Sequence, residues 1–249
     1  MPVTNHQKTK MNNKFSRTAL LIGNDGMEKL SKAHVIVFGI GGVGGYVVEA
    51  LVRSGVSHIT IVDNDVVSET NINRQIIATT NTIGLDKVDV MKERILSINP
   101  EVEVETRKCF YLPETANQFD FKTYDYIVDC IDTVSAKLSI IIEAKKNDVP
   151  VISAMGAGNK MSPSMLEVSD ISKTSVDPLA KVIRTELRKR GINHLKVVYS
   201  QEEPIKIDSD NPNFELKEKS QRPAPGSNAF VPNAMGLIMA SEIINDLIK

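Results

Sequence analysis

The chain has 249 residues, 41% of them hydrophobic and 24% charged, with a formal net charge of −1 at pH 7. These fractions are typical of a globular protein that buries a sizeable core. The charge excludes a uniformly basic nucleic-acid-binding protein, although it allows a local basic face. No apolar run approaches the ~20 residues of a membrane-spanning helix, and the N-terminus lacks the apolar segment of a secretory signal. We expect a cytoplasmic protein without a membrane partner.

The N-terminal residues 1–16 are rich in lysine and have little apolar periodicity, so we expect a flexible lead. Two short helices are predicted next, one over residues 18–23 that Gly23 closes and one over residues 27–32. The second of these helices leads into the first predicted strand.

A glycine cluster follows this strand, which covers residues 35–38. Gly39, Gly41 and Gly44 fit the pattern G-x-G-x-x-G, in which the glycines allow a tight turn, a close phosphate and helix packing on the sheet. Apolar residues from Val43 to Leu51 then recur at helical spacing, and the start of this helix offers free N–H groups to an anion. The pattern predicts a nucleotide site; the alternative is a turn that needs glycine for its backbone angles alone.

A second strand, over residues 58–62, ends in Asp63, which lies 19 residues after Gly44. An acidic side chain at this place accepts hydrogen bonds from ribose hydroxyls. A polar loop over residues 63–75 comes next, and such loops often carry function.

The helix predicted over residues 87–98 begins with Asp86 as a good N-cap. Lys87 lies in its first turn, where a cation opposes the helix dipole. We interpret Lys87 as facing a negatively charged group; the alternative is a solvated surface lysine.

Further strands and helices alternate along the chain, which predicts a Rossmann-like α/β fold with a doubly wound, mostly parallel sheet and helices on both faces. A strand near residues 102–104 has one wet face, and buried strands cover residues 126–132 and 149–154 on either side of a helix that closes at Asn147. Ligands of such sheets bind at the carboxyl ends of the strands. We therefore expect four residues to line one crevice: Gly39, Asp63, Asp129 and Asp132.

The pattern changes in the C-terminal part, residues 161–249, which we expect to be a substrate-binding extension of the same domain. It contains a strand over residues 165–168, a helix from Asp177 to Arg190, a polar loop over residues 201–228 and a closing helix over residues 234–248. Seven lysines and arginines and two acidic residues lie between Lys173 and Lys196. This excess predicts either a phosphate-backbone footprint or an ordinary solvated helix face.

Over residues 15–160 the chain resembles the ThiF/MoeB-type, ubiquitin-activating-like adenylating enzymes. The motifs that carry the resemblance are Gly39-x-Gly41-Gly42-x-Gly44, Asp63-x-Asp65, Asn71-x-x-Arg74-Gln75, Gly84-x-x-Lys87 and Cys130-x-Asp132. It implies that residues 17–160 are an adenylation core that binds ATP and Mg²⁺.

The resemblance also implies roles for single residues. Asp63 holds the ribose, Asp132 binds magnesium, and Asn71, Arg74, Gln75 and Lys87 handle phosphates. Arg17 reaches into the active site of a second subunit, which implies a homodimer. The residues expected to take part in catalysis are Arg17, Arg74, Lys87 and Asp132, and those expected to bind the nucleotide are Gly39, Gly41, Gly42, Gly44, Asp63, Asp65, Asn71, Arg74, Gln75 and Lys87.

The cysteines separate branches of this family. Cys109 and Cys130 fall on different predicted strands without a CxxC pair, which excludes a zinc ribbon built from this chain alone. No cysteine follows Cys130, so the chain lacks a later thioester cysteine and a four-cysteine zinc site. Two unpaired thiols are also ordinary in a reducing cytoplasm.

Among the branches, the chain is most similar to the tRNA threonylcarbamoyladenosine dehydratases, which residues 177–180 and 226–236 support. The resemblance implies that ATP adenylates the threonyl carboxylate of the modified adenosine beside the tRNA anticodon. A nucleophile in the same side chain then closes a ring with net loss of water, so the partner is tRNA.

Three other functions remain open. One is an adenylyltransferase that activates the C-terminal carboxylate of a ubiquitin-like sulfur-carrier protein. Another is a nicotinamide-dependent oxidoreductase, which explains the glycines and Asp63 but neither Arg74 nor Lys87. The third is a nucleotide-binding scaffold without catalytic activity.

Overall fold

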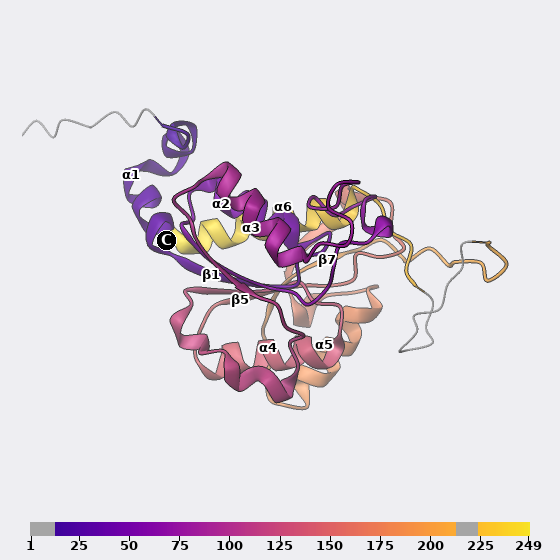
Figure 1. Cartoon of the computed structure of the whole chain (residues 1–249). Helices are drawn as coiled ribbons and strands as arrows, with labels where there is room; N and C mark the ends of the chain where they lie inside the picture. The colour runs from indigo at the N-terminus through magenta and orange to yellow at the C-terminus, as the bar shows by residue number, and fades with distance from the viewer. Residues whose placement is uncertain (1–12, 213–223) are drawn as a thin grey trace, which may run out of the picture.

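The structure, a computed structural model, describes residues 13–212 and 224–249, and within them the strands form one seven-stranded sheet (Figure 1). The strand order is β3-β2-β1-β4-β5-β7-β6. Neighbouring strands are parallel except β6 and β7, which are antiparallel. The strands are β1 (His34–Phe38), β2 (His58–Val62), β3 (Glu103–Arg107), β4 (Tyr126–Asp129), β5 (Val151–Ala154), β6 (Leu166–Asp170) and β7 (Lys196–Ser200).

Helices cover both faces of this sheet, which confirms the predicted Rossmann-like fold. α2, α3 and α6 lie on one face, with α1 beside them, and α4 and α5 lie on the other (Figure 1). Each face has its own cluster of buried hydrophobic residues. The helices are α1 (Ser16–Lys32), α2 (Gly44–Ser54), α3 (Lys87–Ile98), α4 (Val134–Lys146), α5 (Pro178–Arg188) and α6 (Val231–Leu247).

Burial explains the sequence pattern of the strands. The four central strands β2, β1, β4 and β5 are mostly apolar and buried nearly throughout, as strands covered on both faces must be. β3 lies at the edge of the sheet, and its residues alternate between exposed and half-buried. The prediction of a strand with one wet face is correct there.

The structure differs from the sequence analysis in several elements. Residues 196–200 form β7, which was not predicted and which places β6 in the same sheet. α1 begins at Ser16 and is kinked at Gly23, whose φ is 73°, so the two short helices predicted there lie on either side of the kink. α6 begins at Val231, earlier than predicted, with Pro232 in its first turn.

The two cysteines do not lie on strands, so that prediction is wrong. Cys130 follows β4 directly, because this strand ends at Asp129, sooner than expected, and Cys109 lies two residues beyond the end of β3 at Arg107. Both thiols are free.

Parts of two predicted segments cannot be compared with the structure. Residues 1–12 of the N-terminal lead and residues 213–223 of the polar loop lie outside the described residues. The described remainder of the loop, residues 201–212 and 224–228, contains no helix or strand, as predicted. None of the described helices is both long and apolar enough to cross a membrane.

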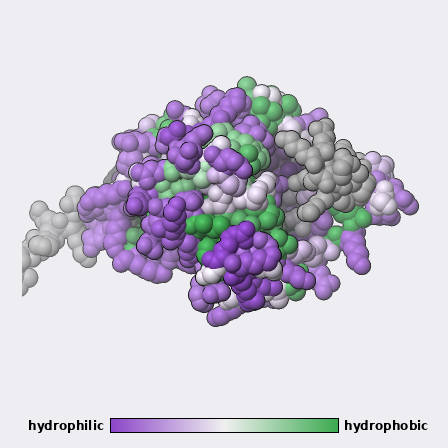
Figure 2. Space-filling model, turned by 90° about the horizontal axis from the view of Figure 1, so that it is seen from below, coloured by the Kyte–Doolittle hydropathy of each residue, from purple (hydrophilic) through white to green (hydrophobic). Residues whose placement is uncertain are grey.

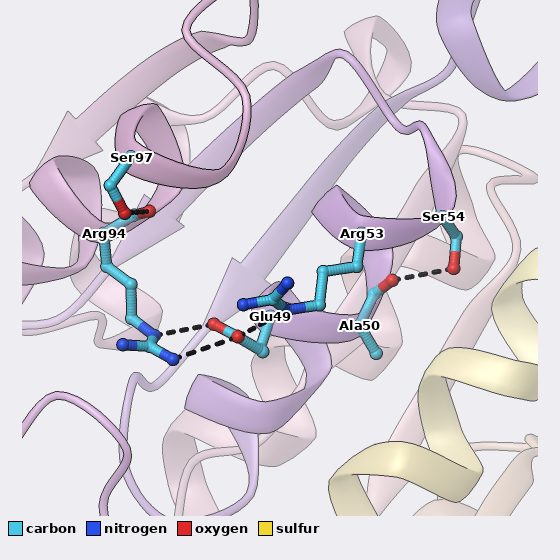
Figure 3. Close-up of polar contacts among 6 residues, drawn as sticks. All are labelled: Glu49, Ala50, Arg53, Ser54, Arg94 and Ser97. Atoms are coloured by element: carbon cyan, nitrogen blue, oxygen red, sulfur yellow. Dashed lines mark hydrogen bonds and ion pairs between the residues drawn. The ribbon is translucent and has the colours of Figure 1, made fainter. Parts of the chain in front are cut away.

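Helices α2 and α3 are joined through Glu49, a largely buried residue of α2 (Figure 3). Arg94 of α3 donates two hydrogen bonds to its carboxylate, at 2.7 and 3.0 Å, and Arg53 donates one at 2.7 Å. Burial alone would raise the pKa of Glu49, but the hydrogen bonds from both arginines lower it. Because α2 starts at the glycine turn and α3 starts at Lys87, this contact fixes the two helix N-termini relative to each other.

Helix α6 is held against the sheet by a second polar cluster. The Asp246 carboxylate accepts hydrogen bonds from Tyr126 Oη of β4 at 2.8 Å and from Lys196 Nζ of β7 at 2.6 Å. Lys249 Nζ donates a third at 2.8 Å. Burial alone would raise the pKa of Asp246, but these three donors lower it from an ordinary value of 3.8 to about 2.

We predict that Asp246→Asn lowers the free energy of unfolding at pH 7 by about 2 kcal/mol. Because the folded pKa lies below the unfolded value, the wild-type stabilisation is complete above about pH 4 and is lost as the pH falls towards 2. Urea unfolding between pH 7 and pH 2.5 measures both effects. Asp25→Asn, at an exposed carboxylate of α1, is the matched control. An equal response of the two variants would contradict this account of Asp246.

Candidate active site

A pocket of about 400 Å³ lies at the carboxyl ends of β1, β2 and β4. The strand order reverses between β1 and β4, and ligands of doubly wound sheets bind at such a switch point. The pocket gathers every residue predicted for the nucleotide site or its crevice except Gly44, Arg17 and Asp129. The predicted residues that line it are Gly39, Gly41, Gly42, Asp63, Asp65, Asn71, Arg74, Gln75, Lys87 and Asp132.

The glycine turn at the floor of this pocket has room for side chains at some positions and not at others. Gly39 has a φ of 88°, and a Cβ there would lie 2.9 Å from the carbonyl oxygen of Cys130. A Cβ on Gly44 would lie 1.8 Å from the Gly39 carbonyl oxygen, which no side chain tolerates. A Cβ on Gly41 would meet nothing nearer than Gln75 Nε2 at 3.8 Å. Gly41 therefore leaves open space beside the turn, where a phosphate approaches the backbone.

Asp63 links the end of β2 to the glycine turn. One carboxylate oxygen accepts a hydrogen bond from the Ile40 N–H at 2.7 Å, and the other accepts one from the Asp65 N–H at 2.9 Å. A carboxylate has about four lone-pair positions, so it can accept further hydrogen bonds from ribose hydroxyls. Asp63 thus holds the turn in place and can still accept hydrogen bonds from a ribose.

Lys87 is almost completely buried, with 5% of its surface exposed, so it is not a solvated surface lysine. Its Nζ donates to the carboxylate of Asp65 at 2.9 Å, and its backbone N–H donates to the Asp65 carbonyl at 3.1 Å. The negative group that the sequence predicts for Lys87 is therefore Asp65, and both residues line the pocket.

Asp86 occupies the N-cap position of α3, but its side chain does not cap the helix. Its carboxylate instead accepts a hydrogen bond from Lys108 Nζ at 2.5 Å. The prediction of a side-chain cap is wrong, because a cation that follows β3 competes for the same oxygens.

The segment from Asn71 to Gln75 carries three predicted phosphate-handling side chains. Asn71 Oδ1 accepts a hydrogen bond from the Ser68 N–H at 3.1 Å, which closes the turn. Arg74 donates to the Thr70 carbonyl at 2.9 Å; burial lowers its pKa, but a guanidinium stays charged at neutral pH. Gln75 Oε1 is buried without a hydrogen-bond partner.

Asp132 lies in the loop after β4, exposed, and lines the pocket. Within residues 13–212 and 224–249, no group of three or more histidine, cysteine, aspartate or glutamate side chains could hold a metal ion. Mg²⁺, however, is usually bound through one or two carboxylates together with substrate phosphates. A single carboxylate beside a phosphate site fits that mode of binding.

Asp129 does not line the crevice, so that expectation is wrong. Its carboxylate is fully buried and bonds to Lys137 Nζ at 2.6 Å and to Ser153 Oγ at 2.5 Å. Lys137, from α4, is itself fully buried and also donates to the Ala154 carbonyl at 2.8 Å. This ion pair lies beneath the loop that carries Asp132 and fixes the end of β4.

Arg17 lies apart from the other residues predicted to take part in catalysis. It is exposed on α1, which leads into the amino end of β1, whereas the pocket lies at the carboxyl end of that strand. Within one chain, the structure does not bring Arg17 to the pocket.

The sequence analysis gave no role in the site to several residues that line the pocket. Cys109, Phe110 and Tyr111 follow β3, and Cys130 follows β4. Burial raises the pKa of Cys130 and that of Cys109, and it raises the pKa of Tyr111 to about 12. Both thiols therefore stay protonated at neutral pH and are poor nucleophiles. Their place directly after parallel strands was the signal that could have found them.

We predict that two alanine variants of the glycine turn lose different properties, one of them ATP binding and the other stability. Gly41→Ala should keep the wild-type melting temperature but weaken ATP binding about tenfold or more, because its methyl group enters the space beside the turn. Gly44→Ala should lower the free energy of unfolding by about 3 kcal/mol, because its methyl group collides with the Gly39 carbonyl. Thermal unfolding and ATP titration separate the two effects. Equal melting temperatures for both variants would refute this account.

Comparison with known proteins places the whole chain in one family. Residues 15–248 match the model of the ThiF family. The chain is 48% identical over 244 residues to the tRNA threonylcarbamoyladenosine dehydratase of Bacillus subtilis (strain 168), a match that covers 96% of each chain. The crystal structure of the E. coli tRNA N6-threonylcarbamoyladenosine dehydratase in complex with ATP matches with a TM-score of 0.84 and 33% identity, over 94% of this chain and 93% of that one.

A relative with another name is more distant. The adenylyltransferase and sulfurtransferase UBA4 of Candida glabrata is 34% identical over 161 residues, which are 64% of this chain and 37% of that protein. The resemblance drawn from the motifs is confirmed: the chain belongs to the ThiF family.

Proposed function

We propose that this protein is an ATP-dependent tRNA threonylcarbamoyladenosine dehydratase. The observation that carries the proposal is a pocket that joins a glycine turn, two buried or half-buried cations and an exposed carboxylate, with both neighbouring thiols protonated. The near full-length identity to the B. subtilis dehydratase supports the same conclusion.

The reaction needs two displacements. The threonyl carboxylate attacks the α-phosphorus of ATP, and pyrophosphate leaves. A nucleophile of the same carbamoyl side chain then attacks the activated carbonyl carbon and loses a proton to solvent, and AMP leaves with one former carboxylate oxygen. Such intramolecular attack is worth an effective molarity of roughly 10⁵–10⁸ M, so the enzyme needs no cysteine nucleophile.

The residues of the pocket serve the first displacement. Arg74 and Lys87 are fixed cations beside the phosphate site, and they stabilise the extra charge on the α-phosphate in the transition state more than in the substrate. Asp132 would hold Mg²⁺, which supplies further positive charge at the phosphates when bound. Asp63 orients the nucleotide through its ribose.

We also propose a homodimer in which Arg17 completes the pocket of the partner subunit. Arg17 is exposed on α1, and Leu20 and Leu21 on the same helix are 84% and 87% exposed. Adjacent exposed leucines are unusual on a helix that faces water alone, which supports a protein contact at α1.

For tRNA, the basic helix α5 is the proposed contact. It lies on the side of the molecule seen in Figure 2, where the surface is largely hydrophilic. Arg184 donates a hydrogen bond to the Thr174 carbonyl at 2.8 Å, and Arg190 forms an ion pair with Glu186 at 2.8 Å. Lys181 and Arg188 are exposed and make no side-chain hydrogen bond or ion pair to any described residue, so these two cations are the ones available to phosphates.

The proposed substrate and the two free thiols favour the cytoplasm as the place of action. Modified tRNA and ATP are both present there, and a reducing compartment keeps Cys109 and Cys130 unpaired.

The proposed activity is tested by nucleoside mass spectrometry of tRNA that carries threonylcarbamoyladenosine. After incubation with the protein, ATP and Mg²⁺, we expect loss of one water from that nucleoside and formation of AMP. Omission of ATP is the control. An unchanged nucleoside, with ATP bound by the protein, would reject the dehydratase and favour activation of a protein carboxylate instead.

The proposed role of Arg17 predicts complementation between two inactive variants. Arg17→Ala and Lys87→Ala should each fold and lose most activity. Mixed subunits should recover up to about a quarter of the wild-type activity, because about half of the dimers are heterodimers and each heterodimer has one of its two sites with neither substitution. Activity after mixing and subunit exchange is the measurement. If no mixture recovers activity, Arg17 does not act across a subunit boundary.

A further inference from the structure

A second pocket, of about 440 Å³, adjoins the nucleotide pocket. The two pockets have a common wall, whose residues are Gly41, Gly42, Arg74, Cys130, Ile131 and Asp132. The cation Arg74 and the carboxylate Asp132 therefore stand between the two spaces. A molecule in the second pocket would meet a nucleotide in the first at this wall.

The far side of the second pocket is the turn after β5, which a buried ion pair holds in place. Lys160 Nζ donates to the Asp177 carboxylate at 2.5 Å and to the Gly156 carbonyl at 2.6 Å. The two side chains are 1% and 0% exposed. Asp177 also accepts the Ala180 N–H at 2.8 Å and so fixes the start of α5. This pair cancels its own charge, which leaves Arg74 and Asp132 as the charges that face an occupant.

The turn that lines this pocket has backbone N–H groups without acceptors. The N–H groups of Gly156, Ala157 and Gly158 donate to no acceptor among the described residues. A Cβ on Gly156 would lie 2.7 Å from Asp177, and one on Gly158 would lie 2.7 Å from Pro225, so glycine keeps both positions free of side chains. Successive unpaired N–H groups suit a carbonyl or carboxylate oxygen.

We propose that the second pocket binds the threonylcarbamoyl-bearing nucleoside of the substrate, extruded from its tRNA loop; this rests on the proposed function. The threonyl carboxylate lies at the common wall, beside Arg74 and the α-phosphate, and the urea carbonyl accepts hydrogen bonds from the Gly156–Gly158 turn. The volume lies within the ~300–1,000 Å³ of small-molecule sites, which is room for a single nucleoside. Extrusion costs least for a base in a single-stranded loop.

The test fills the pocket without touching the nucleotide site. Leu179 lines the second pocket from α5 but not the first, so Leu179→Trp should narrow it. We expect the KM for modified tRNA to rise about tenfold or more, a loss of about 1.4 kcal/mol of binding, with the affinity for a non-hydrolysable ATP analogue within about twofold of wild type. Val182→Trp, one turn further along α5 and 45% exposed, is the matched control for a tryptophan on this helix, and it should leave the affinities for the ATP analogue and for the free nucleoside unchanged.

Direct titration of the free threonylcarbamoyladenosine nucleoside into the protein with bound ATP analogue gives a readout that is independent of turnover. Wild type and Val182→Trp should bind it, and Leu179→Trp should not. Ala157→Val, in the turn after β5 that also lines the pocket, repeats the test should Leu179→Trp fail to fold. If an active wild type and the pocket-filling variants share the same KM and nucleoside affinity, the second pocket is not the substrate site. A wild type that binds ATP but never dehydrates the tRNA would overturn the proposed function as well.

Discussion

The close approach of two backbone segments at the glycine turn determines where the rest of the site lies. Gly44 faces the Gly39 carbonyl so closely that even a methyl group would overlap it, and α2 therefore starts directly against the end of β1. From there the buried Glu49 binds Arg94 and sets the position of α3. The first residue of α3 is Lys87, which pairs with Asp65. The close contact in the glycine turn therefore positions Lys87 indirectly, because it sets α2 and α2 in turn sets α3.

Fixed charges, rather than a reactive side chain, characterise the pocket. Lys87 and Arg74 are held by carboxylate or carbonyl oxygens, so little reorganisation is needed when charge develops nearby. Cys130 is kept neutral by burial. An enzyme whose substrate brings its own nucleophile needs fixed charges in the pocket but no reactive side chain. The chemistry of the pocket therefore agrees better with ring closure inside the substrate than with transfer of an acyl group to the protein.

The sequence predicts those features that depend on local pattern. Strand, glycine turn and helix were predicted because burial on both faces demands an apolar run and because Gly44 has no substitute. The errors concern long-range contacts. Asp129 looked like a crevice residue, but Lys137 and Ser153 draw its carboxylate into the core. Asp86 does not cap α3, because its carboxylate binds Lys108 instead. β7 was missed because its short apolar run follows Lys196, whose charge is neutralised by Asp246 of a helix fifty residues away.

The second pocket could not be predicted from the sequence for the same reason, since its sides come from the ends of β4 and β5, the start of α5 and residues before α6. The C-terminal part of the chain supplies several of the residues that line this pocket. β7, which the sequence did not predict, pairs with β5 in parallel. The Met155 N–H donates to the Val198 carbonyl at 2.9 Å, and this hydrogen bond fixes the turn at Gly156 beside the nucleotide pocket. A carboxylate that enters from this side reaches Arg74 without passing the nucleotide. Two spaces with one charged wall are what a reaction between an acid and an α-phosphate requires.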